Sequence, residues 1–153
     1  MRNLLLATVA IAFCGSSSAL AAGSVDFHLS SSLGKQCSIA ADTTDLVVGP
    51  AAAAVADGAF DTTCNFELSD LTLTFTSLNG GLNNAVENIN AAYNISFDGE
   101  VIDSVTAQGG VSLVRPSGAS ANYPIHRNFS VALQSDLTVA GEYADVLTVD
   151  VAP

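Results

Sequence analysis

The stretch Leu71-Thr72-Leu73-Thr74-Phe75-Thr76 alternates strictly between apolar and hydroxyl-bearing side chains. Successive side chains of a β-strand point to opposite faces of a sheet, so this pattern predicts a strand with its apolar residues buried and its threonines facing solvent. Period-two patterns also occur in residues 36–40, 45–48, 62–68, 93–97, 101–105, 111–114, 125–133 and 143–151. We therefore expect an all-β protein.

Turn-forming residues lie between these segments. Asp98-Gly99, between Phe97 and Val101, predicts a two-residue hairpin because both residue types tolerate a positive φ. The Ala-rich residues 50–56 predict a short helical turn or a loop, and the Asn-rich residues 83–92 predict a loop. Short strands at this spacing indicate a single β-sandwich domain.

The first 22 residues are typical of a secretory signal. Arg2 supplies a positive charge, residues 4–13 form an apolar run too short to span a bilayer, and Ala19-Leu20-Ala21 fits the small-residue cleavage pattern. We expect residues 1–22 to be a signal peptide, so that the mature chain is exported from the cytoplasm.

The charge of the protein is strongly acidic. The formal net charge is -11, and the mature chain would keep only Lys35, Arg115 and Arg127 as fully positive side chains. Such a surface repels nucleic acid and anionic lipid, so neither class of partner is expected.

Two cysteines remain after the leader, which carries Cys14. Cys37 and Cys64 form an even pair in an oxidising compartment, so we expect a disulfide between them. The loop-entropy model gives such a bridge roughly 3.6 kcal/mol of stability. A metal site would need further ligands at short spacing, which the sequence around these cysteines lacks. We expect no metal and no cofactor.

Catalytic residues are sparse. His28 and His126 are the histidines, and neither lies near a motif for a serine or cysteine nucleophile, so we interpret both as surface residues. The carboxylate pairs Asp42 with Asp45 and Asp98 with Glu100 fall in expected turns and are interpreted as solvated acids. The sequence predicts no enzyme activity. Tyr123 is the one tyrosine expected as an exposed platform, which keeps a carbohydrate-binding module as an alternative.

The mature chain opens on another alternating segment. Apolar residues at Val25, Phe27 and Leu29 are separated by polar ones, and Leu33 keeps the same register. The segment is either the first strand of its own domain or a strand that completes the sheet of a neighbouring molecule. Periodicity does not distinguish these alternatives, because it shows which face is apolar and not which sheet is joined.

The end of the chain resembles that of a known family. Residues 140–149 resemble the Gly-x-Tyr-x-Asp ending, followed by alternating Val and Thr, of chaperone–usher pilins, and are most similar to the spore coat protein U domain group, which includes the archaic pili. Residues 71–82 also resemble subunits of that class. One departure is that the chain stops at Ala152-Pro153, whereas many classical pilins end on an aromatic strand residue.

The resemblance implies an immunoglobulin-like β-sandwich that lacks its final strand and has an apolar groove. It divides the chain into a signal peptide (1–22), a donor-strand extension (23–34) and a pilin-like domain (35–153). It assigns Val25, Phe27, Leu29 and Leu33 as plug residues, and Leu147, Val149 and Val151 as the strand beside the groove.

The partners implied by the resemblance are other copies or related subunits, a periplasmic chaperone and an outer-membrane usher. The function implied is that of a structural subunit of a surface fibre that supports adhesion or biofilm formation. The alternative is a self-contained secreted sandwich, either an adhesin or a carbohydrate-binding module, whose N-terminal strand folds back onto its own sheet.

Overall fold

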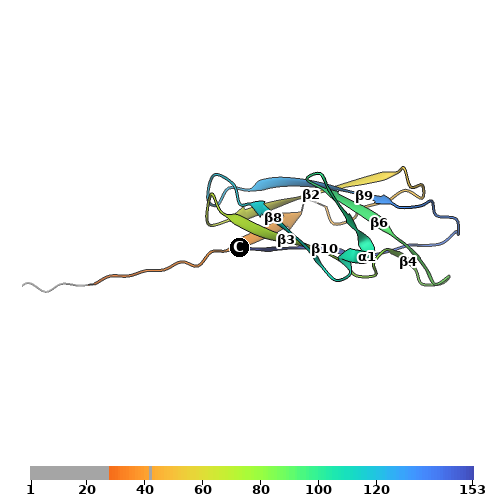
Figure 1. Cartoon of the computed structure of the whole chain (residues 1–153), viewed down its shortest axis with the longest axis horizontal. Helices are drawn as coiled ribbons and strands as arrows, with labels where there is room; N and C mark the ends of the chain where they lie inside the picture. Colours follow the sequence, from red (N-terminus) through yellow and green to blue (C-terminus); the bar gives the residue numbers. More distant parts are fainter. Residues whose placement is uncertain (1–27, 42) are drawn as a thin grey trace, which may run out of the picture. The chain divides into compact units, whose positions relative to one another are not determined.

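The computed structural model describes residues 28–41 and 43–153. The chain divides into two units, residues 1–32 and residues 33–153. In the part that is described, the protein is mostly β, with antiparallel sheets and one short helix (Figure 1). The predicted signal peptide lies outside the described residues.

The strands form three sheets. The five-stranded sheet has the order β1 (Cys37–Ala41), β2 (Val55–Cys64), β9 (Ile125–Leu133), β6 (Tyr93–Phe97) and β7 (Glu100–Asp103). The three-stranded sheet has the order β10 (Leu147–Ala152), β3 (Asp70–Ser77) and β8 (Val111–Pro116). A small hairpin pairs β4 (Leu82–Asn84) with β5 (Ile89–Ala91), and the helix α1 spans Ser104–Ala107.

The two larger sheets share one hydrophobic core. Leu71, Leu73 and Phe75 of β3 are buried, as the alternation predicts. The Phe75 ring centroid lies 6.5 Å from that of Phe60 and 5.1 Å from that of Phe97, both in the five-stranded sheet. These aromatic contacts join the inner faces of the two sheets, and such pairs stabilise a fold beyond the area that they bury.

Several elements match the sequence prediction closely. The strands at residues 93–97 and 125–133 have the predicted bounds. The Asp98-Gly99 turn joins β6 to β7, with Phe97 paired to Glu100 and φ angles of 49° and 81° at the two turn residues. Both residues adopt the left-handed conformation that a tight primed turn requires.

The Ala-rich segment is wrongly predicted beyond residue 54. The chain turns at residues 50–53, but Val55 begins a ten-residue strand that passes through Asp57 and Gly58. Gly58 pairs with Phe129 on β9, and a Cβ at Gly58 would overlap the Phe129 ring. The glycine that looked like a turn residue instead makes room for an aromatic ring on the neighbouring strand.

Two other strand predictions extend too far. The predicted strand 62–68 ends at Cys64, because the chain leaves the sheet and Leu68 adopts a φ of 49° with its side chain 83% exposed. The predicted strand 101–105 ends at Asp103, whose side chain accepts a hydrogen bond from the Val105 amide and caps α1.

Three more predictions are corrected by the strand pairing, or its absence, in the structure. Residues 45–48 alternate in burial but have no assigned strand partner. Residues 83–92, predicted as a loop, include β5 and the last two residues of β4, its hairpin partner. The predicted strand 143–151 is a strand from Leu147 on, preceded by an isolated bridge between Ala144 and Asn83. In each case the presence or absence of a neighbouring backbone decided the outcome, which local alternation does not report.

Candidate functional site

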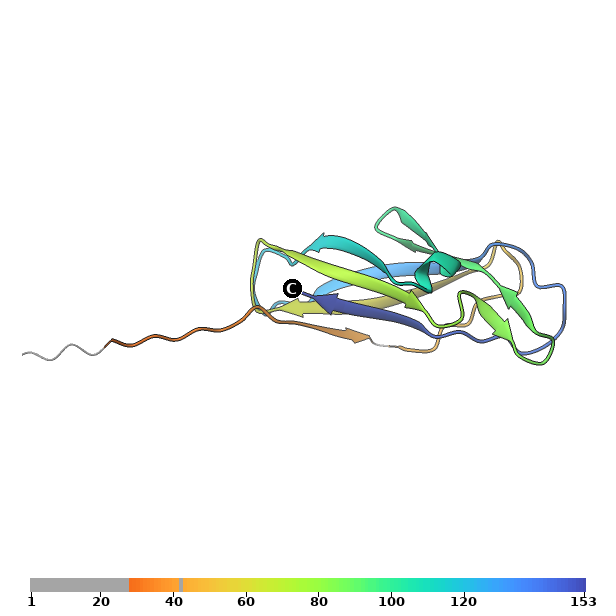
Figure 2. The same ribbon diagram turned by 60° about the horizontal axis from the view of Figure 1, so that its bottom comes forward.

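Two sheet edges lie next to each other without being paired. β1 is an edge of the five-stranded sheet and β10 is an edge of the three-stranded sheet. The two strands are in contact, and Figure 2 shows them side by side. Among the described residues, no backbone hydrogen bond joins β1 to β10. Each strand therefore keeps one row of backbone groups free to pair with a further strand.

An apolar groove lies between these edges. Its volume is about 450 Å³, and its lining includes Ile39 of β1, Leu147 and Val149 of β10, and Phe60, Phe129 and Val131 behind them. Ile39, Phe129, Leu147 and Val149 pack on the core but remain only partly buried. The groove thus exposes apolar side chains of the core beside unpaired backbone.

The predicted groove-flanking residues all face inward along β10. Leu147, Val149 and Val151 are half-buried, whereas the residues between them are exposed. Leu147 and Val149 line the groove, and Val151 packs against the core at the C-terminal end of the same strand.

A polar cluster lies where β10 begins. The Asp145 carboxylate accepts hydrogen bonds from Ser77 Oγ at 2.5 Å, from Tyr93 Oη at 2.8 Å, and from the backbone amides of Asn79 and Val146 at 2.9 and 2.8 Å. Because Ser77 belongs to β3 and Tyr93 to β6, this carboxylate connects both large sheets.

Tyr93 remains a hydrogen-bond donor in this cluster. Burial raises the pKa of its hydroxyl above the ordinary value, and the neighbouring Asp145 carboxylate adds to the effect. Tyr93 and Asp145 both line the groove, so the groove has one polar position in a mainly apolar surface.

A second hollow adjoins the groove beyond Asp145. It has a volume of about 310 Å³, and its lining includes Val47, Leu137 and Tyr143. Leu46, Val48 and Leu82 line both the hollow and the groove, so the two form one continuous trough. We call the two together the β1–β10 trough.

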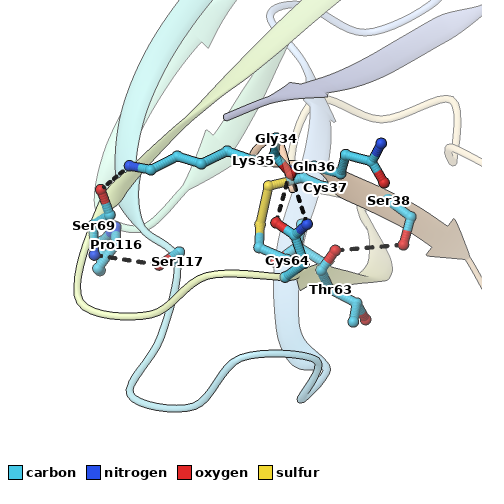
Figure 3. The surroundings of a disulfide bond; sticks show 12 residues. Gly34, Lys35, Gln36, Cys37, Ser38, Thr63, Cys64, Ser69, Pro116 and Ser117 are labelled. Atoms are coloured by element: carbon cyan, nitrogen blue, oxygen red, sulfur yellow. Dashed lines mark hydrogen bonds between the residues drawn. A yellow bond between two sulfur atoms is a disulfide. The ribbon is translucent and has the colours of Figure 1, made fainter. Parts of the chain in front are cut away.

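The predicted disulfide between Cys37 and Cys64 is confirmed (Figure 3). It joins directly opposed residues of β1 and β2. The chain just before β1 is held nearby, because Asn65 Nδ2 donates to the Gly34 carbonyl at 2.8 Å and Asn65 Oδ1 accepts from the Gln36 amide at 2.8 Å. Lys35 Nζ also donates to Ser69 Oγ at 2.7 Å. These contacts hold the residues at which the predicted donor-strand extension (23–34) ends and the domain begins.

The predicted plug residues are only partly described. Val25 and Phe27 lie outside the described residues. Leu29 and Leu33 are 95% and 80% exposed, and residues 28–36 have no strand assignment. Two large apolar side chains of this segment are therefore in contact with solvent in the described structure.

The other candidate residues are scattered. His126 Nδ1 lies 2.9 Å from Asp61 Oδ1 on the exposed face of β9, and His28 is exposed. Tyr123 is exposed, as predicted. Asp98 and Glu100, interpreted as solvated acids, are about half exposed, and both pair with Arg115. The described residues contain no group of three or more His, Cys, Asp or Glu placed to hold a metal ion.

One wall of the trough and its polar position were not predicted from the sequence. Ile39, Leu46 and Val48 form that wall, and their apolar spacing before Gly49-Pro50 was the available signal. Asp145 is the acid of the Gly-x-Tyr-x-Asp ending and was not predicted to be a site residue. A carboxylate at an inward position of an apolar alternation was the signal of a buried hydrogen-bonded group.

Neither the comparison with protein-family models nor the comparison with curated proteins found a match for this chain. Within residues 28–41 and 43–153, no helix has the length and apolar character needed to cross a bilayer.

Proposed function

We propose that the protein is a structural subunit of a bacterial surface fibre, assembled by exchange of donor strands between copies. The observation that carries the proposal is an apolar groove of about 450 Å³ between two sheet edges that are not paired with each other. An extended segment inserted there would satisfy the free backbone groups and cover the exposed apolar side chains.

The segment best suited to the groove is the protein's own N-terminal stretch, donated by another copy. Val25, Phe27, Leu29 and Leu33 present large apolar side chains on one face of an extended chain. Burying each such side chain contributes about 1.5–3 kcal/mol, so four of them outweigh the about 0–1 kcal/mol of a surface ion pair. Strand addition requires no cofactor, and its only covalent chemistry is formation of the disulfide.

The finer fold that accompanies this function is an immunoglobulin-like sandwich that lacks its last strand. Support comes from the core shared by the five- and three-stranded sheets and from the facing edges β1 and β10. Strand addition between them would join the two edges across the open side. The missing strand would then be supplied by residues 23–34 of the next subunit.

The route of assembly follows from the leader and from the hazard of an open groove. An exposed apolar edge promotes aggregation, so the exported subunit needs a partner that covers the groove until exchange occurs. We assign this role to a periplasmic chaperone and the site of exchange to an outer-membrane usher. The finished fibre is on the cell surface, where it serves in adhesion or biofilm formation.

The root of the donor strand is suited to bearing load. Its anchoring contacts at Gly34 and Gln36 lie next to the Cys37–Cys64 disulfide. A pull on the segment would therefore reach β1, which is covalently joined to β2, before it reached the rest of the domain.

The test compares two substitutions that introduce the same charge. Phe27→Asp places a carboxylate on the plug face, and His28→Asp places it on the opposite face of the extended segment. We expect the mature chain with Phe27→Asp to form no polymers, because a buried unpaired charge is costly. The His28→Asp chain should polymerise like the unsubstituted protein, as measured by size-exclusion chromatography and electron microscopy.

Fibres of normal length from the Phe27→Asp chain would disprove the plug assignment. A stable monomer from the unsubstituted mature chain, with its N-terminal segment protected within its own domain, would favour the self-contained module instead. Added peptide of residues 23–34 provides a further check, because it should raise the thermal midpoint of the Phe27→Asp chain by occupying the groove.

A further inference from the structure

Residues 143–151 alternate in burial with the same two-residue period as the apolar pattern of the N-terminal segment. Side chains at residues 143, 145, 147, 149 and 151 are half-buried, whereas those between them are exposed. On an extended N-terminal segment, residues 25, 27, 29, 31 and 33 would share one face. Each series is interrupted by one polar residue, which is the acidic Asp145 in residues 143–151 and the small Ser31 in residues 25–33.

We propose that residues 25–33 of a second copy lie antiparallel to residues 143–151, with Ser31 opposite Asp145 and Leu33 in the second hollow. This inference rests on the proposed function and specifies the direction and the register of the donor strand in the groove. The register pairs Leu29 with Leu147, Phe27 with Val149 and Val25 with Val151, so three of the donor's four large apolar side chains meet an apolar residue of β10.

The opposite direction fits poorly. A parallel strand with Ser31 at Asp145 would place Leu29 and Phe27 beside Tyr143 and Gly141, before β10 begins. Val149 and Val151 would then remain uncovered. Because burial of apolar surface is the main favourable contribution, the antiparallel register is favoured.

The backbone of the receiving strand supports the same register. Ala144 exchanges both of its hydrogen bonds with Asn83, and the Val146 carbonyl accepts from the Leu78 amide. The backbone groups of the even-numbered residues therefore form hydrogen bonds within the protein's own sheets. In an extended chain the alternate residues, Leu147 and Val149 among them, direct their N–H and C=O groups to the open side. They would pair with Leu29 and Phe27 of the donor.

The second hollow explains the position of Leu33. Along one wall the trough runs from Ile39 of β1 to Leu46 and Val48, and along the other it runs from Leu147 back to Tyr143. An antiparallel donor passes Asp145 and then reaches this hollow with its next inward residue, which is Leu33. Ser31 is small and carries a hydroxyl, so it fits beside the Asp145–Tyr93 cluster without placing a large apolar side chain against these polar groups.

The test uses cysteine pairs at exposed positions that face away from the core. In the proposed register, His28 of one copy lies opposite Thr148 of another, at a position where antiparallel side chains are close. Mature chains carrying His28→Cys are mixed with chains carrying Thr148→Cys during assembly. We expect cross-linked dimers on non-reducing gels, at least about tenfold more than with the control acceptors below, because a disulfide requires Cα atoms within about 7 Å.

Two acceptors serve as matched controls. Asp150→Cys lies two residues further along β10, and Glu142→Cys is the position that a parallel donor would place opposite His28. Preferential cross-linking to either one, in fibres that assemble normally, overturns the register and leaves the proposed function standing. Absence of both fibres and cross-links at all three acceptors overturns the proposed function as well.

The hollow is tested separately with Leu33→Ser and Leu137→Ser. Each should lower the denaturant concentration at which fibres dissociate, and the double substitution should be no worse than the more severe single one, because both remove the same contact. Fully additive effects would show that Leu33 is seated elsewhere. Ser32→Ala, on the opposite face of the donor, is the control and should leave dissociation unchanged.

Discussion

The three-stranded sheet has two edges that look alike in sequence and differ in their surroundings. β8 and β10 each have six residues that alternate between half-buried and exposed. At β8, the guanidinium of Arg115 pairs with Asp98 and Glu100 of the β6–β7 hairpin, at 3.0 Å in both cases. Arg127 of β9 donates to the Pro116 carbonyl at 2.7 Å and to Thr62 Oγ1 at 2.9 Å. β8 is thereby tied to the five-stranded sheet.

At β10, the corresponding space is the apolar trough. Within the described residues, no hydrogen bond or ion pair joins β10 to β1, and the connection between the sheets on that side comes from Asp145, just before the strand begins. The difference shows that the same alternating strand becomes a closed edge where polar side chains reach across the sheets, and a binding edge where apolar side chains are left uncovered.

The largest effect on stability is expected at the closed edge. Arg127 is buried, and burial lowers the pKa of its guanidinium. Its hydrogen-bond partners in the described residues are neutral oxygens. Arg127→Met should lower the free energy of unfolding by about 2–3 kcal/mol, because Thr62 and Pro116 lose a charged donor. Urea unfolding followed by circular dichroism, in the non-polymerising Phe27→Asp background, provides the measurement.

The control for this substitution is Arg115→Met. Its carboxylate partners are about half exposed, with side-chain exposures of 48% and 52%, so solvent screens the pairs. The expected loss is at most about 1 kcal/mol. An equal loss for the two arginines would contradict the view that the buried tie from Arg127 is the main closure at this edge.

An intermediate effect, dependent on pH, is expected at the polar end of the open edge. Tyr93→Phe removes one donor to Asp145 and should cost about 1 kcal/mol at neutral pH. The pKa of Tyr93 is raised above its ordinary 10.0 in the folded protein, so the unfolded chain releases this proton first as pH increases. The contribution of Tyr93 is therefore complete below pH 10.0 and is lost above it.

The corresponding measurement is urea unfolding between neutral pH and pH 11. The difference in stability between the unsubstituted and Tyr93→Phe chains should shrink in the alkaline range. Tyr123→Phe, at an exposed position, is the control and should follow the unsubstituted chain. A difference that grows with pH would contradict the proposed protonation of Tyr93.

The smallest effect on the monomer is expected in the groove itself. Val149→Thr keeps the side-chain shape at a half-buried position, so it should cost the unfolding free energy less than about 1 kcal/mol. The same change at buried Val131 should cost about 1–3 kcal/mol, because the added hydroxyl would be desolvated. In the polymerising background, Val149→Thr should nevertheless slow assembly, as followed by light scattering.

This last comparison separates folding from assembly. If Val149→Thr destabilised the monomer as much as Val131→Thr, the open edge would already be covered within the monomer. Equal assembly rates for Val149→Thr and the unsubstituted chain would show that the groove face of β10 takes no part in strand addition.

Much of the local structure was predictable. The alternation in residues 71–76, 93–97 and 125–133 and the turn chemistry of Asp98-Gly99 are local signals, and each is confirmed. The errors at Gly58, at residues 45–48 and at residues 83–92 share one cause. Each depended on what lay alongside: the Phe129 ring beside Gly58, a hairpin partner for residues 83–92, and no strand partner for residues 45–48.

The sequence alone determined which face of each main strand is buried and which cysteine forms the disulfide with Cys37. Side-chain periodicity and the number of cysteines are properties of the chain itself. Only the tertiary structure decided that β8 is tied across the core by Arg115 and Arg127 while β10 faces an apolar trough. The physical reason is that alternation reports which side of a strand is buried, whereas an edge is open or closed according to the side chains that the opposite sheet brings to it.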